Sequence, residues 1–186
     1  MGQFTFIPTE VKDVFIIEAK RFGDERGYFW ETFNEADFEK AGLKLHFVQA
    51  NESRSTKGVL RGLHFQKQHP QGKLVRVTKG KVFDVAVDLR ASSETFGKWV
   101  GVELSEENKR QFYIPEGFAH GFYVLSDIAE FVYQVTDLYH PEDEGGLYWN
   151  DPEIGIKWPL LEDVETKLSP KDLVHPRLSD LEWRFQ

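Results

Sequence analysis

The chain has 186 residues and a formal net charge of -8, and this length fits one domain over residues 1–186. An acidic balance argues against a nucleic-acid partner, which would need a broad basic surface, and the absence of cysteine excludes disulfides and thiolate chemistry. No signal-peptide pattern opens the sequence and no apolar run approaches the roughly 18 residues of a membrane span, so we expect a cytoplasmic protein without a membrane partner.

Two strands are predicted near the amino terminus. Residues 14–18 are a short apolar run, and residues 28–33 follow a glycine-containing turn and are rich in aromatic side chains. In the second strand Phe29 and Glu31 share one face, because side chains alternate with a period of two, and Arg26 lies just before it. A carboxylate beside aromatic residues either points to solvent or belongs to a functional surface.

One clear helix is predicted over residues 34–41. Asn34 is a favourable N-cap, and Gly42 supplies a stop. Phe33 and Phe38 occupy the positions of a hydrophobic staple, which packs the residue before the cap against the first turn. We interpret this helix as structural.

The central region, about residues 45–137, is predicted to be a jelly roll. An aromatic content of 15% suits a β-rich fold, because aromatic side chains pack well on pleated surfaces. Short strands separated by glycine-containing links are typical of a barrel or a double-sheet jelly roll. The predicted strands are 47–54, 59–66, 73–78, 81–89, 99–104, 111–114, 119–125 and 129–136.

The last fifty residues are rich in proline, tryptophan and acidic residues. We interpret them as a segment that wraps the barrel and ends in short helical turns. Ser169 and Pro170 have the form of a helix start, with serine at the cap and proline at the first position. Asp172 stands three residues after that cap, where an acid stabilises a helix start.

The most informative stretch is residues 59–73, which place Arg61, His64 and Lys73 within apolar, strand-like sequence. The wider segment 53–83 contains eight basic residues and no acidic one, although the whole chain is acidic. Positive charge concentrated in this way favours the binding of an anion. Solvated lysines on a sheet face would give the same pattern.

The spacing of Arg61 and His64 predicts an irregular strand. The two residues are three apart, so a regular strand would place them on opposite faces of the sheet. Gly62 between them is suited to a β-bulge, which would turn both side chains to one side. A flat strand there would remove this hypothesis.

Two further side chains have both a structural and a chemical interpretation. His120 follows a turn that contains proline and glycine, and it is either a hydrogen-bonded core residue or part of a site. Tyr133 shares a face with Phe131 and Val135, which indicates core packing. A tyrosine that points into a barrel can also donate a proton.

A bound metal is not expected. The candidate ligands are His64, His69 and His120, and the first two are five residues apart in a segment without a carboxylate. Common sites use closely spaced histidines with a nearby acid. Lys73 would add a positive charge beside the ion.

Seven stretches in order along the chain resemble the dTDP-4-dehydrorhamnose 3,5-epimerase family of the cupin superfamily. The stretches are 24–31, 48–53, 58–66, 71–77, 83–90, 114–122 and 149–156. The resemblance implies an all-β, cupin-type double-sheet jelly-roll barrel with a few short helices. It also implies an epimerase without a cofactor, which inverts carbons 3 and 5 of dTDP-4-dehydro-6-deoxyglucose on the way to dTDP-L-rhamnose.

The resemblance implies roles for individual residues. His64 would be the general base, oriented by Asp172, and Tyr133 would be the general acid on the opposite face of the sugar. Lys73 would stabilise the enolate oxygen. Substrate-binding residues would be Arg26, Phe29, Glu31, Gln49, Asn51, Arg61, His120, Tyr139 and Glu144. The first three would reach the neighbouring subunit's site, which implies a homodimer with exchanged N-terminal strands.

Three alternative functions stay open at this point. The first is a relative that inverts one of the two carbons or shifts the ketone. The second is a metal-dependent cupin such as a dioxygenase. The third is a sugar-nucleotide binding protein without catalysis.

Overall fold

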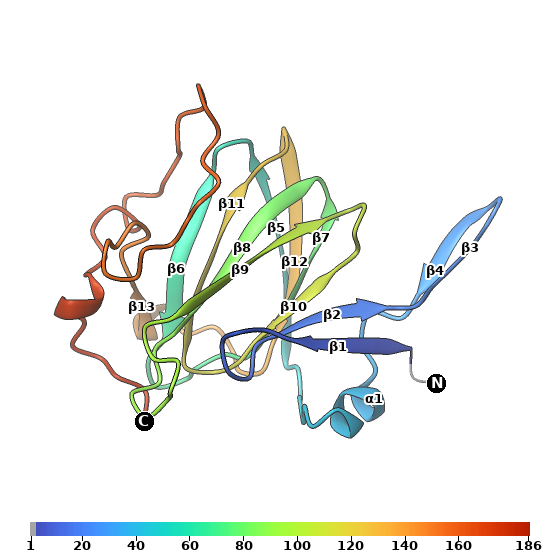
Figure 1. The fold of residues 1–186 in the computed structure, drawn as a ribbon, viewed down its shortest axis with the longest axis horizontal. Helices are drawn as coiled ribbons and strands as arrows, with labels where there is room; N and C mark the ends of the chain where they lie inside the picture. Colours follow the sequence, from blue (N-terminus) through green and yellow to red (C-terminus); the bar gives the residue numbers. More distant parts are fainter. Residues whose placement is uncertain (1–2) are drawn as a thin grey trace.

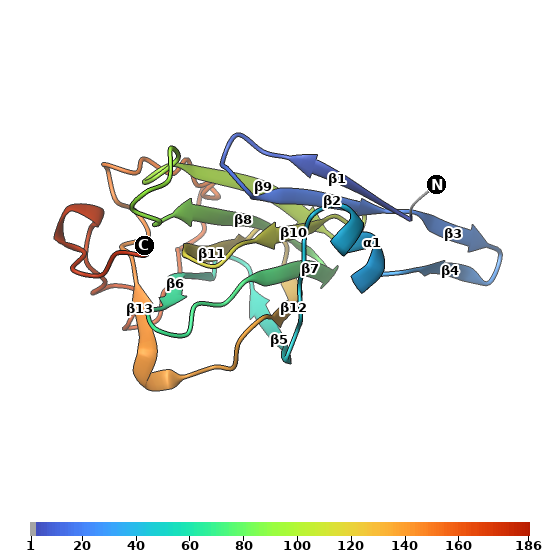
Figure 2. The ribbon, with the colours of Figure 1, turned by 90° about the horizontal axis from the view of Figure 1, so that it is seen from below.

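The computed structural model describes residues 3–186, which form two facing antiparallel sheets (Figures 1 and 2). The larger sheet has the strand order β1 (Phe4–Pro8), β2 (Phe15–Ala19), β10 (Gln111–Ile114), β7 (Lys73–Lys79), β12 (Ile128–Val135) and β5 (Gln49–Thr56). The smaller sheet has the order β13 (Glu144–Gly146), β6 (Leu60–Gln66), β11 (Phe118–Val124), β8 (Lys81–Asp88) and β9 (Trp99–Ser105). Neighbouring strands come from distant parts of the chain, as in a jelly roll. The predicted double-sheet fold is confirmed.

Alternating side chains of the two sheets fill the space between them. Val75, Phe112 and Phe131 come from the larger sheet, and Val102 and Phe122 come from the smaller one. Each is at most 5% exposed. The rings of Phe122 and Phe131 stack with their centroids 4.3 Å apart, so contact across the core fixes the spacing of the sheets.

The predicted helix is confirmed as α1 (Glu35–Lys40), below the larger sheet in Figure 1. The side chain of Asn34 accepts a hydrogen bond from the amide of Asp37, which satisfies one of the free donors of the first turn. The rings of Phe33 and Phe38 lie 4.8 Å apart, as the staple pattern predicts. No helix within residues 3–186 has the length and apolar character needed to cross a membrane.

The strand predicted over residues 28–33 is shorter than expected and lies apart from the main sheets. Strand β4 (Gly27–Trp30) pairs with β3 (Arg21–Asp24), and this hairpin projects away from the body of the molecule (Figures 1 and 2). Phe29 on the hairpin is 70% exposed.

The expectation that Glu31 lies on the face of this strand with Phe29 is wrong. The strand ends at Trp30 because the chain turns there to reach the cap of α1. Glu31 instead accepts a hydrogen bond of 3.3 Å from the side chain of Asn34, so it belongs to the helix entry.

The C-terminal segment lies along the outer side of the smaller sheet, as the wrapping interpretation predicts (Figure 1). It contains the short helical turns η1 (Pro141–Asp143) and η2 (Leu178–Asp180), and strand β13, which pairs with β6. Leu147 and Phe185 from this segment are at most 8% exposed and pack in one cluster with Leu63 and Val87.

The helix predicted to start at Ser169 is absent from the structure. Residues 170–173 form a turn instead. The amide of Asp172 donates to the carbonyl of Ser169, and the Ser169 hydroxyl donates to the Asp172 carboxylate at 2.8 Å. The cap residues therefore close a single turn, and the Asp172 carboxylate also bonds to His64 on β6.

Candidate active site

A cavity of about 550 Å³ lies between strands of the two sheets and the C-terminal segment. All four residues predicted to be catalytic lie on its walls. The lining residues are Val59, Leu60, Arg61, His64, Phe65, Gln66, Gln71, Lys73, Tyr133, Tyr139, Glu144, Lys167, Leu168, Ser169, Lys171 and Asp172. A concave site of this size is suited to a small molecule.

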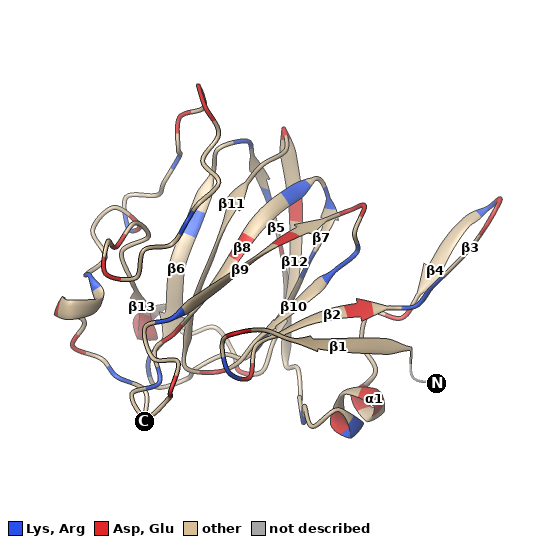
Figure 3. Cartoon of the chain, in the orientation of Figure 1, with Lys and Arg blue, Asp and Glu red and all other residues tan. Residues whose placement is uncertain are grey.

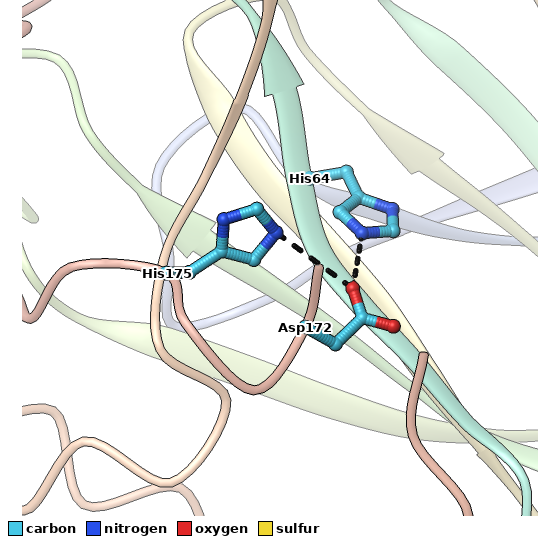
Figure 4. A group of neighbouring side chains, drawn as sticks. All are labelled: His64, Asp172 and His175. Carbon is cyan, nitrogen blue, oxygen red and sulfur yellow. Dashed lines mark hydrogen bonds and ion pairs between the residues drawn. The ribbon is translucent and has the colours of Figure 1, made fainter. Parts of the chain in front are cut away.

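His64 and Asp172 form a hydrogen-bonded pair. The Nε2 atom of His64 lies 2.5 Å from Oδ1 of Asp172 (Figure 4). The carboxylate accepts only, so His64 donates its Nε2–H, and Nδ1 keeps the lone pair that can take a proton. Burial alone would raise the pKa of Asp172, but hydrogen bonds from His64 and Ser169 outweigh it and lower that pKa. Asp172 therefore stays ionised beside the imidazole.

The irregularity predicted at Gly62 is present and turns two side chains toward the cavity. Strand β11 pairs His120 with His64 and Phe122 with Arg61, so one extra residue of β6 is accommodated between them. Gly62 has a φ of +121°, and a Cβ at this position would lie 2.6 Å from Cα of Gly121. Glycine is required here, and the result is that Arg61 and His64 line the same cavity.

Tyr133 faces this cavity from the other sheet. It lies on β12 of the larger sheet, whereas His64 lies on β6 of the smaller one. Tyr133 also packs against the core, and its ring lies 5.9 Å from that of Phe131, so the core-packing interpretation is confirmed for a residue that also lines the cavity. Burial raises the pKa of Tyr133, and the charge of Arg61 opposes that change. The phenol is thus a protonated donor.

Lys73 begins β7 and lines the cavity beside buried carboxylate charge. Burial lowers the pKa of Lys73 to about 8, and the charges of Asp84 and Glu144 partly offset that effect. Asp84 was not singled out from the sequence, although it follows directly after the acid-free segment. A carboxylate among the apolar residues 82–87 of strand β8 is the signal that could have identified it.

His120 lies beneath the cavity and not among its lining residues. It is 8% exposed, and its Nε2 lies 2.9 Å and 3.0 Å from the two carboxylate oxygens of Asp84. Burial lowers the pKa of His120 and raises that of Asp84. The hydrogen-bonded core interpretation of His120 therefore describes its position.

The basic segment divides into two groups, and its strands carry blue patches on both sheets in Figure 3. Only Arg61 and Lys73 of its eight basic residues line the cavity. Others form ion pairs at the surface, such as Lys57 with Asp127 at 2.5 Å. The C-terminal segment adds two cavity cations that sequence patterns did not indicate, Lys167 and Lys171.

The rim of the cavity is held by a chain of polar contacts. Gln49 accepts a hydrogen bond from the amide of Tyr139 at 3.0 Å and donates to Asn51 at 2.8 Å. The hydroxyl of Tyr139 lies 3.4 Å from Glu144, and Lys171 pairs with Glu144 at 2.6 Å. Tyr139 and Glu144 line the cavity, whereas Gln49 and Asn51 stand behind Tyr139.

Three predicted binding residues lie away from this cavity within the chain. Arg26 and Phe29 are on the projecting hairpin, where Arg26 pairs with Asp24, and Glu31 lies at the entry to α1. They line no part of the cavity that holds His64.

Among the described residues, the three histidines considered as metal ligands do not form one ligand group. His64 groups with Asp172 and with His175, a residue that no sequence pattern indicated (Figure 4). His69 lies outside the cavity, in a separate group with Asp137 and His140. His120 bonds to Asp84, as described above.

Known proteins resemble the chain over nearly its whole length. A family model described as dTDP-4-dehydrorhamnose 3,5-epimerase matches residues 8–180. A protein of that name from Methanothermobacter thermautotrophicus is 58% identical over 172 residues, which cover 92% of this chain and 93% of the relative.

Solved structures of sugar-nucleotide epimerases are also similar to the chain in sequence and fold. The dTDP-6-deoxy-D-glucose-3,5-epimerase RmlC from Legionella pneumophila, in complex with dTDP-4-keto-L-rhamnose, has 54% identity and a TM-score of 0.94, covering 98% of this chain and 99% of that one. ChmJ, a 3'-monoepimerase from Streptomyces bikiniensis, has 33% identity and a TM-score of 0.86, covering 92% and 87%. The chain therefore belongs to the dTDP-4-dehydrorhamnose 3,5-epimerase family.

Proposed function

We propose that the protein inverts carbons 3 and 5 of dTDP-4-dehydro-6-deoxy-α-D-glucose to give dTDP-4-dehydro-β-L-rhamnose. The observation that carries this proposal is the placement of His64 and Tyr133 on opposite sheets with one shared cavity. Inversion beside a ketone removes a proton from one face of the carbon and returns one to the other face. One group cannot readily reach both faces, so a separate base and acid are required.

Each inversion is two proton transfers through an enolate. Nδ1 of His64 takes the proton from the carbon, the C–H electron pair forms a carbon–carbon double bond, and the carbonyl pair moves onto the oxygen at carbon 4. Tyr133 then protonates the opposite face, and the carbonyl re-forms. Exchange with water removes the proton from His64 and returns one to Tyr133, so the pair is ready for the second carbon.

Lys73 is the group that stabilises the enolate oxygen. Its ammonium is held in a partly buried site, where a fixed charge acts more strongly than in water. Asp84, bonded to His120, supplies the negative charge that favours the protonated form of Lys73. We assign His120 and Asp84 to this supporting role beneath the substrate.

The charge of the cavity fits a nucleotide diphosphate. Four cationic side chains line it, Arg61, Lys73, Lys167 and Lys171, and two carboxylates, Glu144 and Asp172, oppose them. The difference is a net of two positive charges, and a bridging diphosphate carries roughly two negative charges. We propose that Arg61 binds the diphosphate, because its guanidinium suits phosphate oxygens, and that Tyr139, Glu144, Gln49 and Asn51 contribute to nucleotide binding.

We also propose a homodimer in which the β3–β4 hairpin completes the partner's site. The hairpin projects from its own chain and exposes 70% of Phe29 (Figure 2). Arg26 lies in the turn at the tip of the hairpin and Glu31 directly follows its second strand, and neither lines the cavity of its own chain. Within one chain β1 and β2 join the larger sheet, so the exchanged part is the hairpin. Sedimentation of the full chain tests for the dimer. The R26A variant tests the role of the hairpin, and we expect it to remain a dimer with a raised KM for the nucleotide sugar.

The test of the reaction is NMR of the dTDP-ketosugar in deuterated water. We expect deuterium at both carbon 3 and carbon 5, with inversion at each. Deuterium at carbon 3 alone would favour a one-carbon epimerase, and migration of the ketone would favour an isomerase. Loss of activity on dialysis against a chelator, restored by one metal, would instead favour a metal-dependent cupin.

A further inference from the structure

The pair formed by His64 and Asp172 has a third member, His175. The Nε2 atoms of both imidazoles point at the same carboxylate oxygen, Oδ1 of Asp172 (Figure 4). His64 is 2.5 Å from this oxygen and His175 is 3.7 Å from it. The two rings are nearly perpendicular, with their centroids 5.6 Å apart. Two imidazoles thus converge on one acceptor from different directions.

The Nε2 atom of His175 has no other acceptor to which it could donate a hydrogen bond among the described residues. Among the described residues Nε2 of His175 is buried and has no hydrogen-bond partner. A buried polar atom without a partner is costly and requires an explanation. The carboxylate of Asp172 is the acceptor toward which it points, and a shift of less than an ångström would form a normal hydrogen bond.

The backbone around His175 is shaped to admit its ring. Gly146 on β13 lies against the imidazole, and a Cβ at Gly146 would be 2.3 Å from ring atoms of His175. The other oxygen of Asp172 is held by the hydroxyl of Ser169 at 2.8 Å. The carboxylate is therefore fixed on one side, and Oδ1 is left between the two rings.

We propose that His175 is a positioning residue: it donates Nε2–H to Oδ1 of Asp172 and so holds the carboxylate in the orientation that His64 needs. The inference rests on the proposed role of His64 as the base. A carboxylate oxygen has two lone pairs, so it can accept from both rings at once. His175 does not line the cavity that holds His64.

The surroundings of His175 favour its neutral form, in which one ring nitrogen remains a hydrogen-bond donor. Burial lowers the pKa of His175, and the charge of His64 acts in the same direction. The other charged groups that face it are Asp172 and Glu144, which oppose the change, and Lys171, which supports it. A neutral donor withdraws some of the negative charge that Asp172 offers to His64. His175 therefore moderates the basicity of the base as well as fixing its partner.

The first test uses the unaltered protein. Nitrogen-15 NMR of the histidine side chains distinguishes the two neutral tautomers. We expect His175 to be neutral at pH 7.5 with its proton on Nε2. A proton on Nδ1 would place a lone pair against the carboxylate and would overturn the proposal.

The second test compares His175→Phe with His175→Gln, since the amide of glutamine can replace the Nε2–H donor and phenylalanine cannot. We expect H175F to lower kcat about tenfold, in the range typical of groups that orient a functional side chain. KM should stay unchanged. The acid limb of kcat/KM should move about half a pH unit upward, because Asp172 then stabilises the imidazolium of His64 more strongly. H175Q should restore most of both changes.

The outcomes separate the two proposals. An unchanged acid limb in H175F, or equal defects in H175F and H175Q, would reduce His175 to a packing residue. Wild-type protein that binds the nucleotide sugar and fails to epimerise it would instead reject the proposed function. The tautomer measured by NMR does not depend on activity or on the folding of a variant.

Discussion

Two histidine–aspartate pairs lie side by side in this molecule, and they differ in access. His64 and His120 are register partners on β6 and β11. His64 bonds to Asp172 from a distant turn and is 30% exposed, whereas His120 bonds to Asp84 from the adjacent strand β8 and has a side chain 9% exposed. The same chemical pair therefore appears once at the cavity wall and once inside the core.

The difference shows that pairing alone does not make a histidine a base. The outer imidazole keeps a free nitrogen in reach of a ligand, and its carboxylate is held ionised by hydrogen bonds. The inner pair is buried: burial lowers the pKa of His120 and raises that of Asp84, and the contact between the two side chains opposes both shifts. Because only His64 of the two lines the cavity, we propose proton transfer for His64 and a supporting role for His120.

The largest expected effect is at the outer pair. Replacement His64→Ala should reduce kcat by a factor of about 100 to 10,000, the usual contribution of an acid–base group. The melting temperature should fall less than in H120A, because His64 is partly exposed and Asp172 keeps its hydrogen bond from Ser169. A steady-state assay beside a thermal melt measures both. Full activity in H64A would defeat the assignment.

The same substitution at the inner pair should have the opposite profile. His120→Ala leaves Asp84 buried without its partner, and breaking a buried pair costs about 3 kcal/mol or more. For a chain of this size we expect a fall in melting temperature of about 6–12 °C. Calorimetry of H64A and H120A in parallel provides matched controls. An H120A protein as stable as wild type would contradict the distinction.

The pH dependence of activity should report Lys73. A pKa of about 8 means that the ammonium is present below that pH and is lost as the pH rises through it. We expect kcat/KM to fall above pH 8, approaching tenfold for each further unit, since this ratio reports the free enzyme. In a Lys73→Arg variant the charge persists, so that limb should disappear. If the alkaline decrease in kcat/KM is unchanged in K73R, a group other than Lys73 causes that decrease.

A smaller effect is expected at the rim. Gln49→Ala removes the acceptor for the amide of Tyr139, a hydrogen bond of about 1 kcal/mol. The KM for the nucleotide sugar should rise about fivefold with little change in kcat. A proportional loss of kcat would place Gln49 closer to the chemistry than the structure indicates.

The strands and the helix could be predicted from local sequence patterns, whereas the site depends on contacts between residues that are distant in the sequence. Apolar alternation and glycine-containing turns predicted the strands of the two sheets except β1 and β13, and Asn34 predicted the helix cap. Strand β3 was not predicted, and the end of β4 was placed too late because residues 28–33 continue an aromatic pattern past Trp30, where the chain turns toward the cap of α1. A local pattern cannot show whether residues 31–33 continue the strand or form the entry to the helix.

The site shows the same limit more strongly. Asp172 is 108 residues from His64, and only family resemblance connected them before the structure did. Asp84 meets His120 across neighbouring strands, a pairing that depends on sheet order. His175 lies in an irregular segment with no periodic pattern. Gly62 was an exception, because the three-residue spacing of Arg61 and His64 has a local geometric consequence.

The most direct test of opposed proton transfer is Tyr133→Phe with the dTDP-ketosugar in deuterated water, followed by NMR. With His64 intact and the phenol removed, we expect deuterium to enter the ring while the original configuration is retained, because the base can return a deuteron only to the face it attacked. Inversion in Y133F at the wild-type rate would contradict the assignment of Tyr133 as the acid.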